Sequence, residues 1–164
     1  MVKRKISNFI ETLKEKNYHG HVTAHDNLHI TLHYLGETNK NKLVKVIKEL
    51  NNISVDSFII KTNSIKAFKK NQNKKILYLS INNSQDLSLL HKEVINRLNT
   101  VGYNINVQNY TPHITLMKKV VTRNDIIEKF EFKPFEIKVN SISVMESKRI
   151  DGELVYEELK RIVL

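Results

Sequence analysis

The feature that most constrains the fold is an order of secondary-structure patterns that occurs twice along the chain. In each half, two strand patterns stand in succession between helical patterns, the second of them contains His-x-Thr, and a further strand pattern closes the half. The second half has one extra strand pattern in front. This mixture of helices with adjacent strands predicts an α+β fold built on antiparallel sheets. The repetition predicts one bilobal domain of two pseudo-symmetric sheets, with helices on their outer faces and a central cleft between the His-x-Thr strands.

The helical patterns are apolar stripes at the i, i+3, i+4, i+7 spacing of a helix with one buried face. Thr38 is the expected N-cap of the second helix, and Gly102 is the expected left-handed residue after the third. The expected helices cover residues 3–17, 38–50, 85–100 and a short segment opened by Thr122 and Asp125.

The strand patterns are rich in β-branched and aromatic residues and are separated by turn-forming residues. Segment 69–75 contains no apolar residue and is expected to be a basic loop. Asp151-Gly152 is expected to form the two-residue turn of a hairpin. The expected strands cover residues 19–25, 28–35, 58–68, 76–81, 103–108, 113–120, 135–145 and 154–163.

Composition narrows the class of protein. A chain of 164 residues with 40% hydrophobic and 27% charged residues is typical of one soluble globular domain. The absence of cysteine excludes disulfides and thiolate metal sites and favours a cytoplasmic location. No apolar stretch reaches the roughly 18 residues of a spanning helix, so a membrane protein is not expected. The net charge of +10 favours nucleic acid or another phosphate-bearing ligand, although many lysines serve only to solvate a surface.

Two identical tetrapeptides occupy matching points of the two halves, namely His29-Ile30-Thr31-Leu32 and His113-Ile114-Thr115-Leu116. A chain of this composition contains two such copies by chance with a probability on the order of a tenth of a per cent. On a strand, residues i and i+2 share a face, so each imidazole and its threonine hydroxyl point the same way. The second copy therefore outweighs the interpretation of either histidine as an ordinary structural residue.

The chemistry of this pair suits a phosphodiester. Imidazole titrates near neutral pH, so a neutral copy can accept a proton while a charged copy donates one. The hydroxyls of Thr31 and Thr115 can donate hydrogen bonds to non-bridging phosphate oxygens. These four side chains need neither a metal ion nor another cofactor for that reaction.

The segments around both motifs resemble a known family, the two-histidine (2H) phosphoesterases, and within it the RNA 2′,3′-cyclic phosphodiesterases, also called 2′-5′ RNA ligases. Asn27–Glu37, which contains Leu-Gly-Glu after His-x-Thr, is similar to the first family motif, and Thr111–Leu116 to the second. Ser143–Ser147, followed by Gly152 and Tyr156, is similar to the C-terminal hairpin of the family. The resemblance covers nearly the whole chain.

The resemblance implies an enzyme that hydrolyses 2′,3′-cyclic phosphates at RNA 3′ ends, or in cyclic nucleotides, to 2′-phosphates. His29 and His113 are then the catalytic pair, and Thr31, Thr115 and Lys118 bind the phosphate. His113 is taken as the base and His29 as the acid, an assignment that the sequence leaves open. We also expect a cytoplasmic monomer that acts without metal or cofactor.

Two departures from the family pattern modify this expectation. Relatives usually begin with a short apolar strand, whereas this sequence begins within the first expected helix, so residues 1–164 are expected to form one 2H domain that lacks that strand. Such a gap exposes a sheet edge. Gln108 and Lys118 stand where relatives often carry arginine, and a lysine offers a point charge instead of a bidentate fork.

Two alternative functions stay open. Four histidines recur at every fourth residue, and on a helix they would share one face and form a metal site. Gly20, the Asp26-Asn27 turn and several β-branched residues disfavour a helix there. A non-catalytic RNA-binding module would use the positive charge together with exposed aromatic rings. The histidines are His21, His25, His29 and His33; the aromatic candidates are Tyr34, Tyr78 and Tyr110; the candidate RNA path is Lys61, Lys66, Lys69, Lys70, Lys74 and Lys75.

Overall fold

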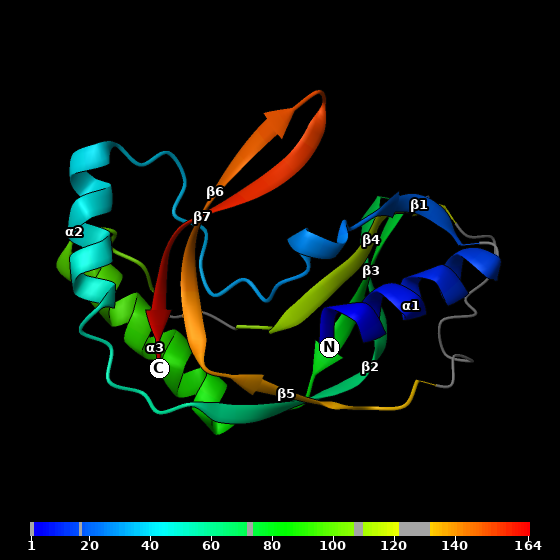
Figure 1. The fold of residues 1–164 in the computed structure, drawn as a ribbon, viewed down its shortest axis with the longest axis horizontal. Helices are drawn as coiled ribbons and strands as arrows, with labels where there is room; N and C mark the ends of the chain where they lie inside the picture. The colour runs from blue at the N-terminus through cyan, green and yellow to red at the C-terminus, as the bar shows by residue number, and fades with distance from the viewer. Residues whose placement is uncertain (1, 17, 72–73, 107–109, 122–131) are drawn as a thin grey trace. The chain divides into compact units, whose positions relative to one another are not determined.

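The structure is a computed structural model that describes residues 2–16, 18–71, 74–106, 110–121 and 132–164, with only the backbone at 69–71 (Figure 1). Its helices are α1 (Val2–Glu15), η1 (a 3-10 helix, His25–Asn27), α2 (Lys40–Leu50) and α3 (Gln85–Thr100). Its strands are β1 (His19–Val22), β2 (Phe58–Asn71), β3 (Lys74–Ile81), β4 (His113–Val121), β5 (Glu136–Val139), β6 (Ser141–Ile150) and β7 (Glu153–Val163).

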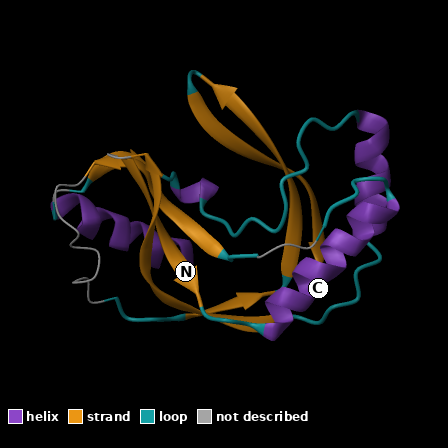
Figure 2. Cartoon of the chain, turned by 180° about the vertical axis from the view of Figure 1, so that it is seen from behind, coloured by secondary structure: helices purple, strands orange, loops and turns teal. Residues whose placement is uncertain are grey.

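The described strands form a five-stranded sheet in the order β1-β4-β3-β2-β5 and a two-stranded sheet, β6-β7 (Figure 2). Neighbours from β1 to β2, and the pair β6-β7, are antiparallel. The predicted α+β fold with antiparallel sheets is therefore confirmed.

The chain divides into two compact units, and neither unit is one half of the sequence. Unit 1 contains Met1–Thr31, Lys61–Asn82 and Pro112–Ile137, and unit 2 contains Leu32–Ile60, Asn83–Thr111 and Lys138–Leu164. Both His-x-Thr triplets belong to unit 1, so the expectation of one motif in each lobe is wrong. The reason is direct pairing, because the segment that carries the first motif lies beside β4.

The core of unit 1 lies between α1 and the sheet. The apolar stripe of α1 buries Ile6, Ile10 and Leu13, and the helix contacts β4. Leu77 of β3 and Leu116 of β4 are fully buried, at 0% exposure each. Alternate residues of these strands therefore face the core, and the residues between them face the opposite side of the sheet.

A glycine allows β1 to lie close to β4. A Cβ atom at Gly20 would stand 2.7 Å from the carbonyl oxygen of Lys118 and 2.8 Å from Cγ2 of Val120. The role of Gly20 is this close backbone approach, which no larger residue permits.

Unit 2 contains α2, α3 and the hairpin β6-β7. Helices α2 and α3 contact each other, and Arg97 of α3 forms ion pairs with Glu93 at 2.8 Å and with Glu49 of α2 at 3.9 Å. The predicted hairpin turn is confirmed, because Asp151 and Gly152 have φ angles of 51° and 83°.

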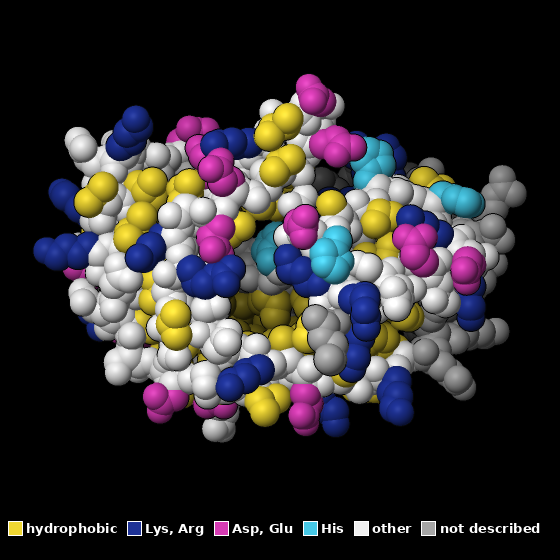
Figure 3. Space-filling model, in the orientation of Figure 1, with side chains coloured by type: hydrophobic (Ala, Val, Ile, Leu, Met, Phe, Trp, Pro, Cys, Tyr) yellow, Lys and Arg dark blue, Asp and Glu magenta, His cyan; other side chains and the backbone are white. Residues whose placement is uncertain are grey.

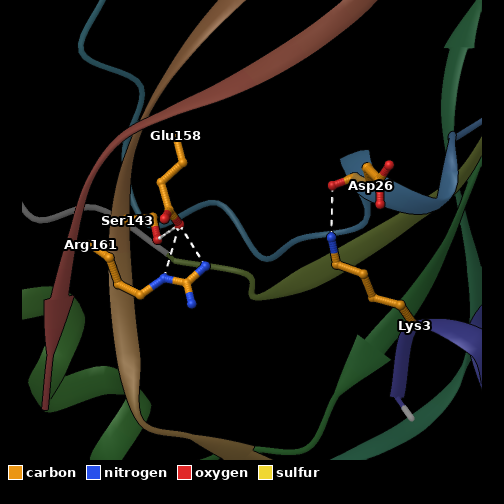
Figure 4. Close-up of polar contacts among 5 residues, drawn as sticks. All are labelled: Lys3, Asp26, Ser143, Glu158 and Arg161. Atoms are coloured by element: carbon orange, nitrogen blue, oxygen red, sulfur yellow. Dashed lines mark hydrogen bonds and ion pairs between the residues drawn. The ribbon is translucent and has the colours of Figure 1, made fainter.

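Side-chain hydrogen bonds form within the hairpin, and the bond from Ser143 joins its two strands. Glu158 of β7 accepts hydrogen bonds from Ser143 of β6 at 2.6 Å and from Arg161 at 2.9 and 3.1 Å (Figure 4). These bonds lower the pKa of the Glu158 carboxyl, with Ser143 as the largest cause.

Two predicted strands are wrong. Residues 28–35 form no strand beyond a single bridge at Ile30, and residues 103–106 form none, while 107–108 lie outside the described residues. Near the second segment, the Asn99 side chain accepts from the backbone N–H of Ile105 at 2.6 Å and donates to its carbonyl at 2.9 Å. The Asn99 side chain therefore forms the hydrogen bonds that a neighbouring strand would otherwise form with Ile105.

The expected loop at 69–75 is also wrong, because β2 and β3 continue into it and pair at Lys69–Lys75 and Asn71–Lys74. The N-cap of α2 is Asn39 instead of Thr38, whose hydroxyl hydrogen-bonds the hydroxyl of Tyr103 at 3.0 Å. The expected strand at 135–145 is interrupted at Asn140 between β5 and β6.

Other predictions agree with the structure. The helix at 85–100 is confirmed without change, and Gly102 has the expected positive φ of 83°. The short helix expected after Thr122 lies outside the described residues.

Candidate active site

The second His-x-Thr triplet lies within β4, which has hydrogen-bonded neighbours along both edges. Ile114 is 4% exposed and faces the core with Leu116. His113 and Thr115 therefore project from the opposite face of the sheet, where both side chains are half-buried. On β3, Ser80 lies opposite His113, and Tyr78 lies opposite Thr115.

The first triplet lies alongside the second, because Ile30 forms an antiparallel bridge with Ile114. Residues that flank a bridged pair lie opposite each other across the two chains. The bridge therefore places the backbone of His29 beside that of Thr115, and the backbone of Thr31 beside that of His113. Within the first copy the two side chains lie together, because Nε2 of His29 is 3.1 Å from Oγ1 of Thr31.

This pairing brings the backbones of the two histidines close together. His29 and His113 flank the bridge diagonally, and the Cα atoms of diagonal neighbours in a regular antiparallel pair lie roughly 7–8 Å apart. The sequence predicted that these two residues meet, and it could not predict that their own backbones pair.

Hydrogen bonds to both ring nitrogens orient His29. Nδ1 lies 2.6 Å from the carbonyl oxygen of Asn27, and Nε2 lies 3.1 Å from Oγ1 of Thr31. A carbonyl only accepts, so Nδ1 is the nitrogen that donates to Asn27. Thr31 thus contacts the other ring nitrogen, Nε2, directly.

Helix α1 holds the turn that precedes the first triplet. Lys3 donates a hydrogen bond to the carbonyl oxygen of Asp26 at 2.7 Å (Figure 4), and the hydroxyl of Ser7 lies 2.9 Å from Nδ1 of His25. Both contacts are to η1, which ends at Asn27, the residue whose carbonyl binds His29. The first helix therefore supports the position of the first histidine.

Aromatic rings surround His113. The rings of Phe68 and Tyr78 are stacked with centroids 4.0 Å apart, and each lies 5.3 Å from the His113 ring at a steep angle. Burial raises the pKa of the Tyr78 hydroxyl. Sequence analysis considered Tyr78 either as core or as an RNA contact, and it did not identify its packing against His113, because the strand register was unknown.

Lys118 lies on the same face of the sheet, further along β4. A register shift places Met117 opposite Leu77 on the core side, so Lys118 returns to the face that carries His113. It lies opposite His21 of β1 and is exposed. Gln108, the other departure from the family pattern, lies outside the described residues.

The histidines that recur at every fourth residue from His21 to His33 do not share a helix, because His21 belongs to β1 and His25 to η1. Within the described part of the chain, no group of three or more His, Cys, Asp or Glu side chains is arranged to hold a metal ion.

The three aromatic candidates differ in exposure. Tyr34 is 77% exposed and Tyr78 is buried, whereas the Tyr110 ring is half-buried and stacks on His91 of α3 at 3.9 Å. Burial raises the pKa of Tyr110. Tyr34 is therefore the only one of the three that presents its ring fully to solvent.

Lys and Arg side chains are spread over the visible face of the protein, with Asp and Glu side chains among them (Figure 3). No helix in the described residues is both long and apolar enough to cross a membrane.

Comparison with known proteins adds family evidence. The family model described as the 2′-5′ RNA ligase superfamily matches residues 2–151. The chain is 24% identical over 163 residues to the RNA 2′,3′-cyclic phosphodiesterase of Thermotoga maritima, covering 96% of this chain and 87% of the relative. It is 30% identical over 148 residues to the protein of that name from Aquifex aeolicus, covering 84% of this chain and 78% of the relative.

Solved structures with the same fold include Escherichia coli LigT in complex with 3′-AMP. That structure has a TM-score of 0.78 at 21% identity and covers 98% of this chain and 91% of its own. A protein of Thermus thermophilus has a TM-score of 0.80 at 15% identity, with coverage of 99% and 91%.

Proposed function

Because the chain belongs to the 2′-5′ RNA ligase superfamily, we propose that it hydrolyses 2′,3′-cyclic phosphates, at RNA 3′ ends or in cyclic nucleotides, to 2′-phosphates. The observation that carries the proposal is the antiparallel bridge between Ile30 and Ile114, because it sets the backbones of the two His-x-Thr triplets side by side. The names of the Thermotoga and Aquifex relatives support the same substrate class.

In the proposed reaction, water attacks the phosphorus atom and the bond to the 3′-oxygen breaks. His113 accepts the proton of the water, and Nε2 of His29 donates a proton to the leaving 3′-oxygen. The reverse assignment uses the same two side chains and balances equally well. In either case one proton enters and one leaves the pair, so the enzyme returns to its starting protonation after proton exchange with water.

The remaining groups stabilise the charge on the phosphate. The hydroxyls of Thr31 and Thr115 lie beside the two imidazoles and donate to the non-bridging oxygens, while Lys118 supplies a positive charge from further along β4. No metal ion or other cofactor takes part in this proposal, and the reaction is assigned to these side chains alone.

The test is hydrolysis of a 2′,3′-cyclic nucleotide in the presence of a chelator, with the product identified by phosphorus NMR. His29→Ala and His113→Ala are each expected to lower turnover by about a hundredfold or more, because each removes one proton-transfer group. The matched control is His19→Ala, since His19 is an exposed histidine at the far end of β1.

Circular dichroism must show that all three variants fold. A folded His113→Ala variant with unchanged turnover would falsify the mechanism. RNA binding without any turnover by the natural protein would favour the non-catalytic module instead.

A further inference from the structure

A row of side chains leads across the sheet from the candidate site to a lysine. The first triplet bridges β4 at Ile114, next to Thr115. Thr115 lies opposite Tyr78 of β3, and Tyr78 lies opposite Lys66 of β2. Residues opposite each other on neighbouring strands share a face of the sheet. Lys66 therefore projects from the same face as the second His-x-Thr triplet.

A second contact confirms which face this is. Phe68, two residues after Lys66 on β2, has its ring against both Tyr78 and His113. Since residues i and i+2 of a strand point the same way, the side chain of Lys66 leaves the sheet on the side of His113.

Four of the five strands of this sheet carry no acidic residue, and the fifth, β5, carries Glu136. The sequences of β1, β2, β3 and β4 contain neither aspartate nor glutamate. Within the described part of the chain, Lys66 is exposed, and its ammonium group forms no hydrogen bond or ion pair. Its positive charge is therefore available to an anion from outside the protein.

The spacing indicates which anion. Lys66 lies two strands from Thr115, roughly 9–10 Å at the usual strand separation, and the Tyr78 ring stands between them. The reacting phosphate, held by the two triplets, is therefore not the natural partner of this ammonium group. An anion displaced from the reacting phosphate by about one nucleotide is a better match, because a lysine side chain spans part of that distance.

We propose that Lys66 binds the phosphodiester of the nucleotide that precedes the reacting end, so that the site prefers a cyclic-phosphate end of an RNA chain to a free cyclic nucleotide. The inference rests on the proposed function and names its preferred substrate class. Lysine suits this role because it recognises a backbone phosphate as a point charge, independent of base sequence.

The experiment compares kcat/KM for a dinucleotide that ends in a 2′,3′-cyclic phosphate with kcat/KM for the corresponding cyclic mononucleotide. Lys66→Gln is expected to lower the ratio of dinucleotide to mononucleotide about tenfold, mainly through the KM of the dinucleotide. Lys66→Arg keeps the charge and is expected to restore most of the ratio.

The matched control is Arg4→Gln, which removes one exposed positive charge from α1, the helix that packs on the core side of this sheet. That variant should leave the ratio within about twofold of the natural protein. The same comparison over a range of salt concentration gives a second readout, because salt screens the attraction between Lys66 and the phosphodiester, so the ratio should fall with salt more steeply in the natural protein than in Lys66→Gln.

The outcomes separate the two proposals. Equal losses on both substrates in Lys66→Gln, or equal loss of the ratio in Arg4→Gln, overturn the role of Lys66 and leave the proposed hydrolysis intact. If the natural protein hydrolyses neither substrate, the proposed function fails and this inference fails with it.

Discussion

The two copies of His-Ile-Thr-Leu have identical residues and different backbones. The copy at 113–116 lies inside β4, between hydrogen-bonded neighbours, whereas the copy at 29–32 makes one isolated bridge, from Ile30 to Ile114. The intrinsic preference for a strand is therefore the same in both copies, and what differs is the number of neighbouring strands with which each backbone can pair. A tetrapeptide becomes a strand only where neighbouring chains can satisfy its backbone groups.

The two histidines are also held by different means. His29 is oriented by the carbonyl of Asn27 and the hydroxyl of Thr31, which belong to its own segment. His113 packs against the rings of Phe68 and Tyr78, which belong to neighbouring strands. The irregular copy thus depends on local hydrogen bonds, and the strand copy depends on tertiary packing.

The largest difference between the copies should appear in stability. Ile114→Ala is expected to lower the free energy of unfolding by about 2–5 kcal/mol, because Ile114 is only 4% exposed and its truncation leaves a cavity. Ile30→Ala should cost less, about 1 kcal/mol, because its side chain is half-buried. Urea unfolding of both variants measures the difference. Equal losses would mean that the first copy is as tightly packed as the strand.

The next effect concerns the local hydrogen bonds of the first copy. Thr31→Val is expected to lower kcat/KM about tenfold, because it removes the hydroxyl that contacts Nε2 of His29. Thr31→Ser keeps the hydroxyl and serves as the control, with activity close to that of the natural protein. Full activity in Thr31→Val would show that this contact does not orient the imidazole.

A smaller effect is expected from the packing around the second copy. Tyr78→Leu should reduce kcat severalfold, because an aromatic contact contributes about 0.5–1.5 kcal/mol and its loss frees the His113 ring. Tyr78→Phe keeps the ring and should retain activity. The two variants need to be compared at equal folded fraction, measured by near-ultraviolet circular dichroism. If Tyr78→Leu is as active as Tyr78→Phe, ring packing does not hold His113 in position.

The smallest effect concerns the chain that follows the first copy, within unit 2. Burial lowers the pKa of His91, nearby His33 lowers it further, and a hydrogen bond with the Leu32 backbone opposes the shift. Burial also lowers the pKa of His33. A histidine with a lowered pKa contributes its full stability above its ordinary pKa of 6.5, and this stability is lost as the pH falls below that value.

We therefore expect Tm to decline as the pH is lowered from about 7 to 5. His91→Phe preserves a ring against Tyr110 and should flatten that decline. Calorimetry at a series of pH values provides the measurement. An unchanged slope in the variant would assign the pH dependence to other groups.

The structure shows where pattern analysis works and where it stops. Helices α1, α2 and α3 followed from apolar spacing, since a helix satisfies its backbone hydrogen bonds within its own segment, whereas the 3-10 helix η1 was not predicted. Strand predictions succeeded for β3, β4 and β7 and failed at 28–35 and 103–106. The Asn99 side chain hydrogen-bonds the backbone N–H and carbonyl of Ile105, and the local sequence pattern does not indicate that contact.

The candidate site divides in the same way. His29, His113, Thr31 and Thr115 were identified from the repeated tetrapeptide, because a strand period of two places histidine and threonine on one face. Phe68, Tyr78 and Lys66 were not assigned to that face, since their place depends on register between strands that are distant in sequence. Knowledge of the pairing Tyr78–Thr115 alone would have identified Tyr78.

The amino-acid sequence by itself determined the helices, the hairpin turn at Asp151-Gly152 and the chemistry of the two His-x-Thr triplets, because these depend on residues close together in the chain. Only the tertiary structure decided that both triplets lie in one compact unit, joined at Ile30 and Ile114, and that a lysine of β2 shares the face of the second triplet. Pairing between distant strands is a property of the whole chain, since each backbone group can bond to any exposed partner and the packed core selects among them.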